Sequence, residues 1–375
     1  MTSLFDDIRP YRDDEIPAAM QRIAASEYFP LLASYVFPAT PVDEVREFVL
    51  SFRTIYDFQA GVMARVNEQV IERTTTSFTY GGIELLDPAK NYLFVSNHRD
   101  IMLDSSLLQY VLHKNGLRTT EITFGANLMS TPLVIDIGKS NKMFRTERGG
   151  NMKEFYKQSL YLSQYIRYVI TEKGESVWIA QRNGRTKDGN DATDQGIIKM
   201  FAMSRSGSRA ESLAELNIVP VAVSYEWESC DILKTLELYQ SRNTKYVKKS
   251  GEDLNSILTG IMQPKGRVHI EVCRPITLGE LQPFDDLAAA EFNRKAAALL
   301  DERIYEKYLL TPNNYIAWDL RSGGQRFADR YTTAEKEAFM AHLSKLDAYA
   351  EFDRGALREI MLGIYANPIE HKIFQ

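Results

Sequence analysis

The sequence predicts an α/β protein in which a mixed, largely parallel central sheet is flanked by helices, with an N-terminal helical region and C-terminal helices. Short apolar segments alternate with helical stretches between residues 76 and 280, which is typical of parallel strands joined by helices. Apolar residues instead recur at helical spacing over residues 1–75 and again from about residue 285. We therefore expect an N-terminal helical region over 1–75, an α/β domain over 76–280 and a C-terminal helical extension over 281–375.

The N-terminal region contains a strong helix-start pattern. Thr40 and Pro41 precede Asp43 and Glu44, which supplies an N-cap residue, a first-turn proline and acids near the positive end of a helix. Apolar residues then recur at helical spacing as far as Val70. We expect this segment to pack on a core, with a membrane-facing surface as the alternative.

Strands are predicted wherever a short apolar or β-branched run is bounded by polar residues. The sequence predicts a strand and turn over 77–85, and strands over 92–96, 121–124, 176–180, 218–225 and 267–272. Helices are predicted over 104–114, 151–172, 194–204, 252–263, 286–308, 333–348 and 353–365. Thr332 and Glu335 form a capping box that marks the start of one of the last helices.

Composition excludes several classes of protein. Hydrophobic residues make up 44% and charged residues 25% of the 375 residues, which is ordinary for a globular protein. The net charge of -5 argues against nucleic acid as the main partner, because binding to phosphate backbones needs a basic face. Cys230 and Cys273 form neither a disulfide framework nor a zinc-ligand pattern, and they fit buried residues in a reducing compartment. We expect no metal site.

No segment predicts export or a membrane span. The first seven residues are acidic and lack the apolar core of a signal peptide. No run approaches the roughly 20 apolar residues that a membrane helix requires. We therefore expect a cytoplasmic protein.

The first candidate catalytic segment follows the predicted strand 92–96. Asn97 and His98 come directly after the strand, and Asp104 lies at the start of the next helix. Ligands bind at the carboxyl ends of strands in open α/β sheets. A histidine held in one tautomer by a carboxylate can take a proton from a hydroxyl group, so we expect His98 to be a general base. A purely structural His–Asp pair is the alternative.

Two other enzyme classes can be compared with this segment. His98, Arg99 and Asp100 match the tripeptide of a protein-kinase catalytic loop, but Ser105 stands where that loop needs asparagine. The chain also lacks a glycine-rich loop before this segment and Asp-Phe-Gly after it. A serine hydrolase needs the elbow Gly-x-Ser-x-Gly, which the chain does not contain.

Two basic segments predict an anion site. Lys139, Lys142, Arg145 and Arg148 lie within ten residues, before Gly149 and Gly150. Guanidinium groups suit bidentate binding of phosphate, although a solvated basic loop is the alternative.

The second basic segment follows the predicted strand 176–180 and contains Arg182, Arg185 and Lys187. Three positive charges at one strand end repel each other unless an anion joins them. The acids that follow do not match a calcium loop, because Ala192 breaks the pattern and no glutamate closes it. We interpret Asp188, Asp191 and Asp194 as a solvated turn before a helix.

Taken in order, these segments resemble the glycerolipid acyltransferase superfamily, which includes glycerol-3-phosphate and 1-acylglycerol-3-phosphate acyltransferases. The family's first block, His, four residues, Asp, is similar to His98–Asp104, and its second block is similar to Met143–Arg148. Its third block resembles Arg182–Arg185, and its apolar strand with proline resembles Val219–Val221. The resemblance covers residues 95 to 225.

Two departures from the family pattern bear on the site. Five residues rather than four separate His98 from Asp104, and one extra residue turns a helical position by about 100°. Either the helix starts later here, or Asp100 assists His98. Asn183 stands where the family has glutamate. An amide is neutral and can donate as well as accept, which leaves open a different acceptor or a slower reaction.

The resemblance implies an acyltransferase in which His98 and Asp104 are catalytic and Arg145, Arg148, Arg182 and Arg185 bind the acceptor phosphate. Supporting roles are implied for Asn97, Asn183, Gly184 and Lys187. The acyl donor would be acyl-CoA or an acyl-carrier protein, with no further cofactor. The acceptor would be glycerol 3-phosphate, 1-acylglycerol 3-phosphate or another lyso-lipid or aminoacyl lipid, and a non-catalytic lipid- or carrier-binding relative is a third possibility.

Such a protein would work at the inner membrane face as a peripheral protein or on soluble carriers. A basic cluster of Arg242, Lys245, Lys248 and Lys249 would suit an acidic carrier or anionic headgroups, with a solvated helix end as the alternative.

Overall fold

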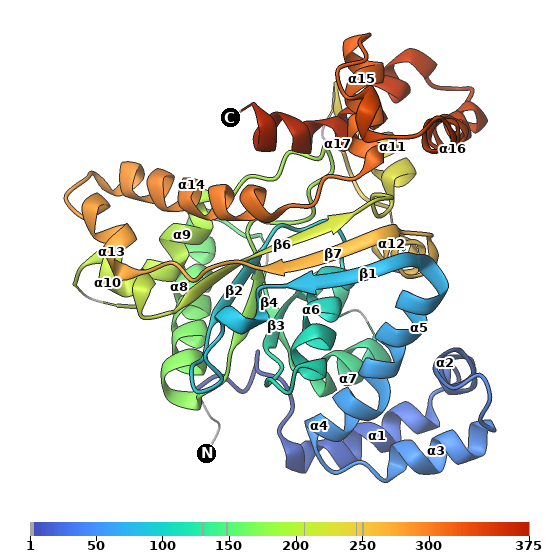
Figure 1. The fold of residues 1–375 in the computed structure, drawn as a ribbon. Coiled ribbons are helices and arrows are strands. Elements are labelled where there is room, and N and C mark those ends of the chain that lie inside the picture. The colour runs from blue at the N-terminus through green and yellow to red at the C-terminus, as the bar shows by residue number, and fades with distance from the viewer. Residues whose placement is uncertain are drawn as a thin grey trace.

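The computed structural model describes residues 4–129, 131–147, 149–205, 207–244, 246–249 and 251–374. Seven strands of these residues form one sheet in the order β1-β7-β6-β2-β5-β3-β4 (Figure 1). The strands are β1 (Thr75–Gly81), β2 (Leu93–Ser96), β3 (Glu121–Gly125), β4 (Met143–Thr146), β5 (Val177–Ala180), β6 (Ile218–Tyr225) and β7 (Gly266–Val272).

The sheet is mixed and largely parallel, so the predicted fold class is confirmed. Strands β2 to β6 run in one direction, because each neighbouring pair among them is parallel. Strand β7 is antiparallel to β6 and parallel to β1. Strand β4 was not predicted, because only Met143 and Phe144 of its four residues are apolar.

Helix α6 (Leu103–Lys114) covers one face of the sheet, together with α5 (Ala64–Thr74) and α12 (Glu252–Met262). Side chains of α6 pack there against Phe94, Trp178 and Val221, which alternate along β2, β5 and β6 with residues of the opposite face. Alternation is the expected result of strand geometry, in which successive side chains point to opposite sides.

The opposite face is covered by α8 (Met152–Tyr168), α9 (Gln195–Ala202), α10 (Arg209–Ala214) and α14 (Ala289–Lys307). Leu93, Val95 and Ile179 of the sheet belong to this core cluster, as does Phe292 of α14. Helix α14 lies within the segment expected to be a C-terminal extension, yet it packs directly on the sheet (Figure 1).

The N-terminal helices have a hydrophobic cluster of their own. They are α1 (Ile16–Ala25), α2 (Phe29–Val36), α3 (Val42–Leu50) and α4 (Ile55–Phe58), and they pack beside α7 (Pro132–Ser140). The predicted N-cap at Thr40 is wrong, because Pro41 takes that position and α3 ends at Leu50. Thr54 then starts a new helix by capping Asp57. The apolar spacing continued across this break, which is why the sequence predicted one helix.

Helix α13 (Leu278–Leu281) packs beside α10. The remaining helices share a hydrophobic cluster, and they are α11 (Asp231–Ser241), α15 (Pro312–Ser322), α16 (Thr333–Leu343) and α17 (Arg354–Ile373). Asp231 ties three of them together, since it accepts hydrogen bonds from His342 and Tyr365, each at 2.6 Å. The predicted capping box of Thr332 and Glu335 is confirmed. Within the described residues, no helix combines the length and apolarity needed to cross a membrane.

The neighbouring strands β2 and β5 are followed by connections that run to opposite faces of the sheet. The chain leaves β2 over one face through α6, and it leaves β5 over the other face through α9 and α10. Ligands in open α/β sheets bind where neighbouring strands send their connections to opposite faces. The predicted segments that begin at His98 and Arg182 both lie at this point.

Candidate active site

His98 lies two residues beyond the end of β2 and contacts a carboxylate. Its Nδ1 atom is 2.9 Å from Oδ2 of Asp104, and the residue is 8% exposed. The ring is tilted by 73° against the ring of Trp178, with 5.9 Å between ring centroids. No hydrogen bond to Nε2 is found among the described residues. One ring nitrogen is therefore fixed by an acid, and the other remains able to exchange a proton with a substrate.

Asp104 is held in place by donors other than His98. Oδ2 accepts hydrogen bonds from the backbone N–H groups of Arg99 and Asp100, at 2.6 and 2.9 Å. Oδ1 accepts one from the hydroxyl of Tyr225 at 2.9 Å. Burial and the neighbouring Asp104 raise the pKa of Tyr225 well above its ordinary value, so the phenol stays a donor. The carboxylate lies in the first turn of α6, where the helix dipole favours negative charge.

Asp100 has a different role from Asp104. Its Oδ1 accepts from the backbone N–H groups of Met102 and Leu103, both at 2.8 Å, and its Oδ2 accepts from Ser229. These bonds start helix α6, which begins at Leu103, so the extra residue lies in the loop before the helix. The geometry therefore assigns the support of His98 to Asp104.

Arg99 is a buried ionic anchor that sequence reasoning did not single out. It is 1% exposed, donates to Oδ2 of Asp191 at 2.9 and 2.6 Å, and pairs with Glu228 at 3.1 Å. Lys234 pairs with the same Glu228 and donates to the carbonyl of Arg99 at 2.7 Å. The network fixes the backbone next to His98. The tripeptide His98-Arg99-Asp100 was the available signal, but nothing local indicated that its arginine is buried.

The prediction of a solvated turn is wrong for Asp191, which is 1% exposed. Besides Arg99, it accepts hydrogen bonds from Asn97 at 3.1 Å and from Thr186 at 2.6 Å. A buried arginine needs a carboxylate, and Asp191 provides it from the segment after β5. Asp194 does lie on the surface, where it caps α9.

The loop after β5 crosses directly beside His98. Thr186 donates its backbone N–H to the carbonyl of His98 at 2.7 Å, and Gln181 donates to the carbonyl of Ser96 at 2.8 Å. Asn97 in turn bonds both backbone groups of Val223 on β6. Gly184 has a φ of +84°, a conformation that side chains disfavour, which lets this loop turn. The loop after β5 and strand β6 thus hold the segment that carries His98.

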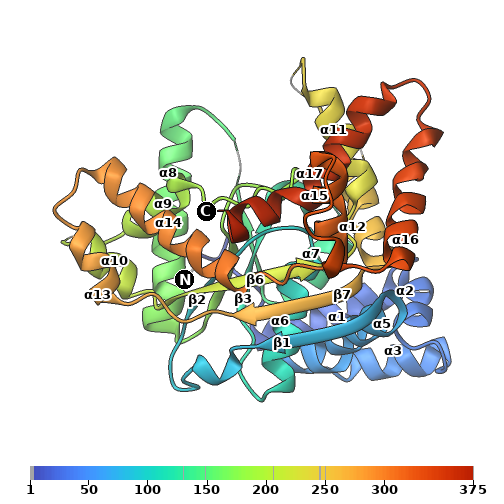
Figure 2. The ribbon, with the colours of Figure 1, turned by 45° about the horizontal axis from the view of Figure 1, so that its top comes forward.

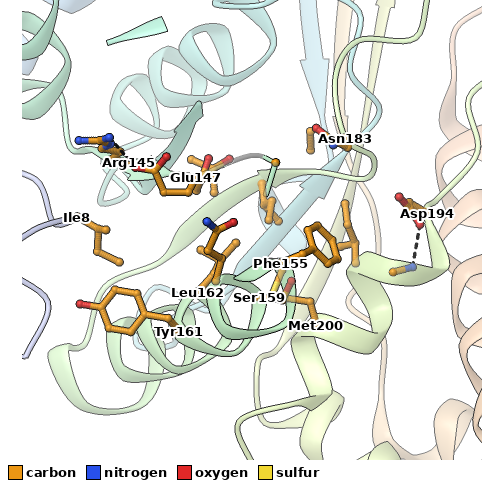
Figure 3. Close-up of a pocket in the computed structure, with 18 of the residues that line it drawn as sticks. Ile8, Arg145, Glu147, Phe155, Ser159, Tyr161, Leu162, Asn183, Asp194 and Met200 are labelled. Carbon is orange, nitrogen blue, oxygen red and sulfur yellow. Dashed lines mark hydrogen bonds and ion pairs between the residues drawn. The ribbon is translucent and has the colours of Figure 1, made fainter. Parts of the chain in front are cut away.

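A cavity of about 420 Å³ lies at the carboxyl ends of β3, β4 and β5, between α8 and α9. Arg145, Arg182 and Asn183 line it, whereas His98 is not among its lining residues. Figure 3 shows Arg145 and Asn183 on opposite sides, with the apolar residues Phe155 and Leu162 between them. The lining of the cavity therefore combines apolar side chains with polar and charged ones.

The cations of this cavity are balanced by acids. Arg145 pairs with Glu147 at 2.6 Å, and both side chains are half exposed, so this pair is readily exchanged for a ligand. Arg182 donates to the carbonyl of Asn190 at 3.4 Å. Asp7 and Asp194 also line the cavity.

The other predicted phosphate ligands lie in different surroundings. Arg185 has a buried Nη1 atom without a hydrogen-bond partner. Burial and Asp100 raise the pKa of the Cys230 thiol, whereas the positive charge of Arg185 opposes that shift. Lys187 forms an ion pair with Glu237 of α11. Arg148 lies outside the described residues.

The sequence is similar to those of known acyltransferases. Residues 77–224 match the acyltransferase family model. The chain is 27% identical over 208 residues to the glycerol-3-phosphate acyltransferase of Pseudomonas syringae pv. tomato, covering 53% of this chain and 23% of that protein. It is 28% identical over 244 residues to the enzyme of the same name from Alteromonas mediterranea, covering 60% and 27%. The match thus spans about a quarter of these relatives' length.

A solved structure, the 1-acyl-sn-glycerophosphate acyltransferase from Thermotoga maritima, is similar with a TM-score of 0.40 at 10% identity, covering 76% of this chain and 94% of that chain. The family match extends from β1 to β6 and includes every segment of the resemblance. The family match and the named relatives show that residues 77–224 are similar to acyltransferases of the glycerolipid type.

Proposed function

We propose that this protein is an O-acyltransferase that moves a fatty acyl group from a thioester to a hydroxyl of glycerol 3-phosphate or 1-acylglycerol 3-phosphate, in phospholipid synthesis. The observation that carries the proposal is the His98–Asp104 pair, whose carboxylate is fixed by Tyr225 and two backbone N–H groups. The similarity to enzymes named glycerol-3-phosphate acyltransferase supports the acceptor class.

The proposed reaction is a direct transfer. Nε2 of His98 takes the proton of the acceptor hydroxyl as its oxygen attacks the thioester carbonyl. Asp104 orients the ring and stabilises the charged imidazolium that forms. The carbon–sulfur bond then breaks, and the leaving thiolate takes the proton from Nε2, which returns His98 to its starting state. No acyl-enzyme forms, in agreement with the missing serine elbow, and no cofactor beyond the thioester donor is needed.

Arginine side chains are proposed to hold the acceptor phosphate. Arg145 and Arg182 line the cavity, and the unpartnered Nη1 of Arg185 supports a place for this residue near the anion. A guanidinium that binds phosphate typically contributes about 1.5–3 kcal/mol per charge-assisted bond. The apolar residues Phe155 and Leu162 suit an acyl chain at the same cavity.

A second acceptor class is favoured by one observation. Asn183 lines the cavity at the position where the family has glutamate. An amide there can donate a hydrogen bond to an ester or amide carbonyl, which a carboxylate cannot. A lyso-lipid or aminoacyl lipid without a simple phosphate is therefore the alternative acceptor.

The experiment offers purified protein each acceptor with acyl-CoA and with acyl-carrier protein, and reads free thiol and product mass. His98→Ala should lower turnover by about 100- to 10,000-fold. Arg182→Ala should raise the KM for the phosphate acceptor about 10- to 100-fold and leave the donor KM unchanged.

Arg118→Ala is the matched control. Arg118 is exposed, lies just before β3 and donates to the carbonyl of Gly174, and it does not line the cavity. Near-normal turnover in His98→Ala contradicts the proposed base. Donor binding without any thiol release by the wild-type protein favours a non-catalytic relative.

A further inference from the structure

Helix α12 has its large apolar side chains on the outside. Leu254, Leu258 and Met262 are 57%, 54% and 61% exposed, and their spacing of four residues puts them on one side of the helix. The buried residues of the same helix are Ser256 and Gly260. A surface helix of a globular protein normally turns its apolar side toward the core. This exposed stripe therefore indicates an apolar partner.

The buried side of α12 rests on the loop that carries His98. A Cβ atom on Gly260 would lie 2.2 Å from Oδ2 of Asp100, so only glycine permits this close approach. The carbonyl of Ser256 accepts from the thiol of Cys230 at 3.2 Å. Helix α12 lies at the end of the sheet toward which β6 points (Figure 1). The apolar stripe is thus one helix thickness away from the proposed catalytic loop.

A basic segment precedes this stripe. Residues 242–249 contain Arg242, Lys245, Lys248 and Lys249 and no acidic residue. Arg242 and Lys249 are exposed, and Val247 beside them is 78% exposed. Lys248 pairs with Asp253 at 2.5 Å, and Lys245 lies outside the described residues. Exposed apolar side chains next to cations match the acyl region and the anionic headgroups of a membrane surface.

The start of α8 also carries exposed apolar side chains. Met152, Phe155 and Tyr156 are 91%, 58% and 56% exposed, and Phe155 also lines the cavity. In Figure 2 the start of α8 and the end of α11, which leads to the basic segment, both project toward the upper edge.

We propose that the outer side of α12 and the exposed cations Arg242 and Lys249, which precede it in the chain, form a docking surface for an anionic lipid bilayer. Binding itself is independent of catalysis. Its consequence, delivery of a lipid acceptor or release of a lipid product beside His98, rests on the proposed function. An acidic carrier protein would meet the cations but leaves the stripe of Leu254, Leu258 and Met262 unexplained.

The test is sedimentation with vesicles of phosphatidylcholine alone or with about 30% phosphatidylglycerol. The full chain should bind the anionic vesicles. Leu254→Gln/Leu258→Gln should weaken binding at least 10-fold, because two inserted side chains are lost. Arg242→Gln and Lys249→Gln should each weaken it about fivefold, and only on anionic vesicles. All of these positions are exposed, and an unchanged melting temperature checks that the variants are folded.

Leu31→Gln on α2 is the matched control, since Leu31 is 71% exposed and lies in the N-terminal helices. Full binding by the α12 double variant, or an equal loss in Leu31→Gln, overturns the proposal. A dimer in size-exclusion chromatography that Leu254→Gln/Leu258→Gln dissolves also overturns it, because the stripe then belongs to a second copy. If the protein binds vesicles but shows no turnover, the docking surface is supported and the proposed reaction is rejected. If it turns over soluble acceptors but does not bind vesicles, the proposed reaction is supported and the docking surface is rejected.

Discussion

Tyr225 donates its hydroxyl to Asp104 across an oxygen–oxygen distance of 2.9 Å, on the carboxylate oxygen that His98 does not contact. The phenol comes from β6 and the carboxylate from α6, so the bond fixes the acid from a separate element of the fold. Asp104 is fully buried, so its carboxylate oxygens cannot bond to water. A buried oxygen without a hydrogen-bond donor would destabilise the folded state. The bond therefore links the stability of the sheet to the orientation of His98.

Tyr225→Phe should lower both stability and turnover. The variant leaves one buried carboxylate oxygen without a donor, which costs about 1–3 kcal/mol in the free energy of unfolding. Turnover should fall several-fold while the acceptor KM stays constant, because Tyr225 reaches the substrate only through Asp104 and His98. Urea unfolding and initial rates check this. An unchanged unfolding midpoint would mean that the bond is dispensable.

Asp104→Asn should remove catalysis without removing the fold. The amide oxygen can still accept from the backbone N–H groups of Arg99 and Asp100, and the amide nitrogen can meet the hydroxyl of Tyr225. The negative charge that stabilises the imidazolium is lost, so kcat should fall about 100- to 10,000-fold.

Asp100→Asn is the control for this prediction, because Asp100 accepts backbone and Ser229 donors but does not contact His98. It should keep most of the activity. An equal loss in both variants would show that the negative charge of the loop, rather than the contact with His98, matters.

The strands were predictable because each consists of a short apolar run. Strand β6 was predicted with its observed bounds, since its eight residues are all buried. Strand β4 is different, because Arg145 and Thr146 make up half of it and its apolar run is too short to predict a strand. Its extended conformation depends on backbone pairing with β3, which the local sequence does not show. Helices α7, α10, α11 and α15 were not predicted at all.

The reactive pair was predictable and its surroundings were not. His98 and Asp104 are close in sequence, and the short loop before α6 brings them together. Arg99 and Asp191 are 92 residues apart, and only the neighbouring positions of β2 and β5 make them partners. Without that contact, charged residues in a loop are rightly expected to be solvated. The spacing of α12 predicted a helix, but it did not reveal that the apolar side faces outward.

Asp191→Asn should destabilise the protein strongly. Among the described residues, it leaves the buried Arg99 with Glu228 as its carboxylate partner, and Lys234 pairs with that same glutamate. Breaking a buried pair by removing one partner costs about 3–5 kcal/mol. Urea unfolding measures the loss. Turnover per folded molecule should also fall, because the network holds the backbone beside His98.

Glu68→Gln serves as the surface control for Asp191→Asn. Glu68 pairs with Lys114 at 2.7 Å, and both side chains are more than a third exposed. Exposed pairs typically contribute about 0–1 kcal/mol, so this change should hardly move the unfolding midpoint. Equal effects of the two substitutions would mean that Arg99 is not the anchor inferred from its burial.

Asp301 of α14 gives the protein a defined pH dependence. Its carboxylate accepts from the backbone and hydroxyl groups of Thr193, yet burial raises its pKa from 3.8 to about 6. The folded state therefore binds the proton of Asp301 more tightly than the unfolded state does. The stability that this proton contributes is fully present below about pH 4 and is lost as the pH rises through 6. Asp285 behaves oppositely, since its hydrogen bonds, the first from Ser208, lower its pKa.

Asp301→Asn should therefore make the protein more stable at pH 7.5, by about 2–3 kcal/mol if the bonds to Thr193 persist, and nearly equal to wild type near pH 4. Unfolding free energies measured between pH 4 and 8 give the difference curve, which should rise through about pH 6. Asp285→Asn is the control of opposite sign and should destabilise the protein at pH 7.5 while having little effect at low pH. A difference curve for Asp301→Asn that stays flat through pH 6 would mean that this carboxylate is already ionised in the folded protein and that burial in α14 does not govern it.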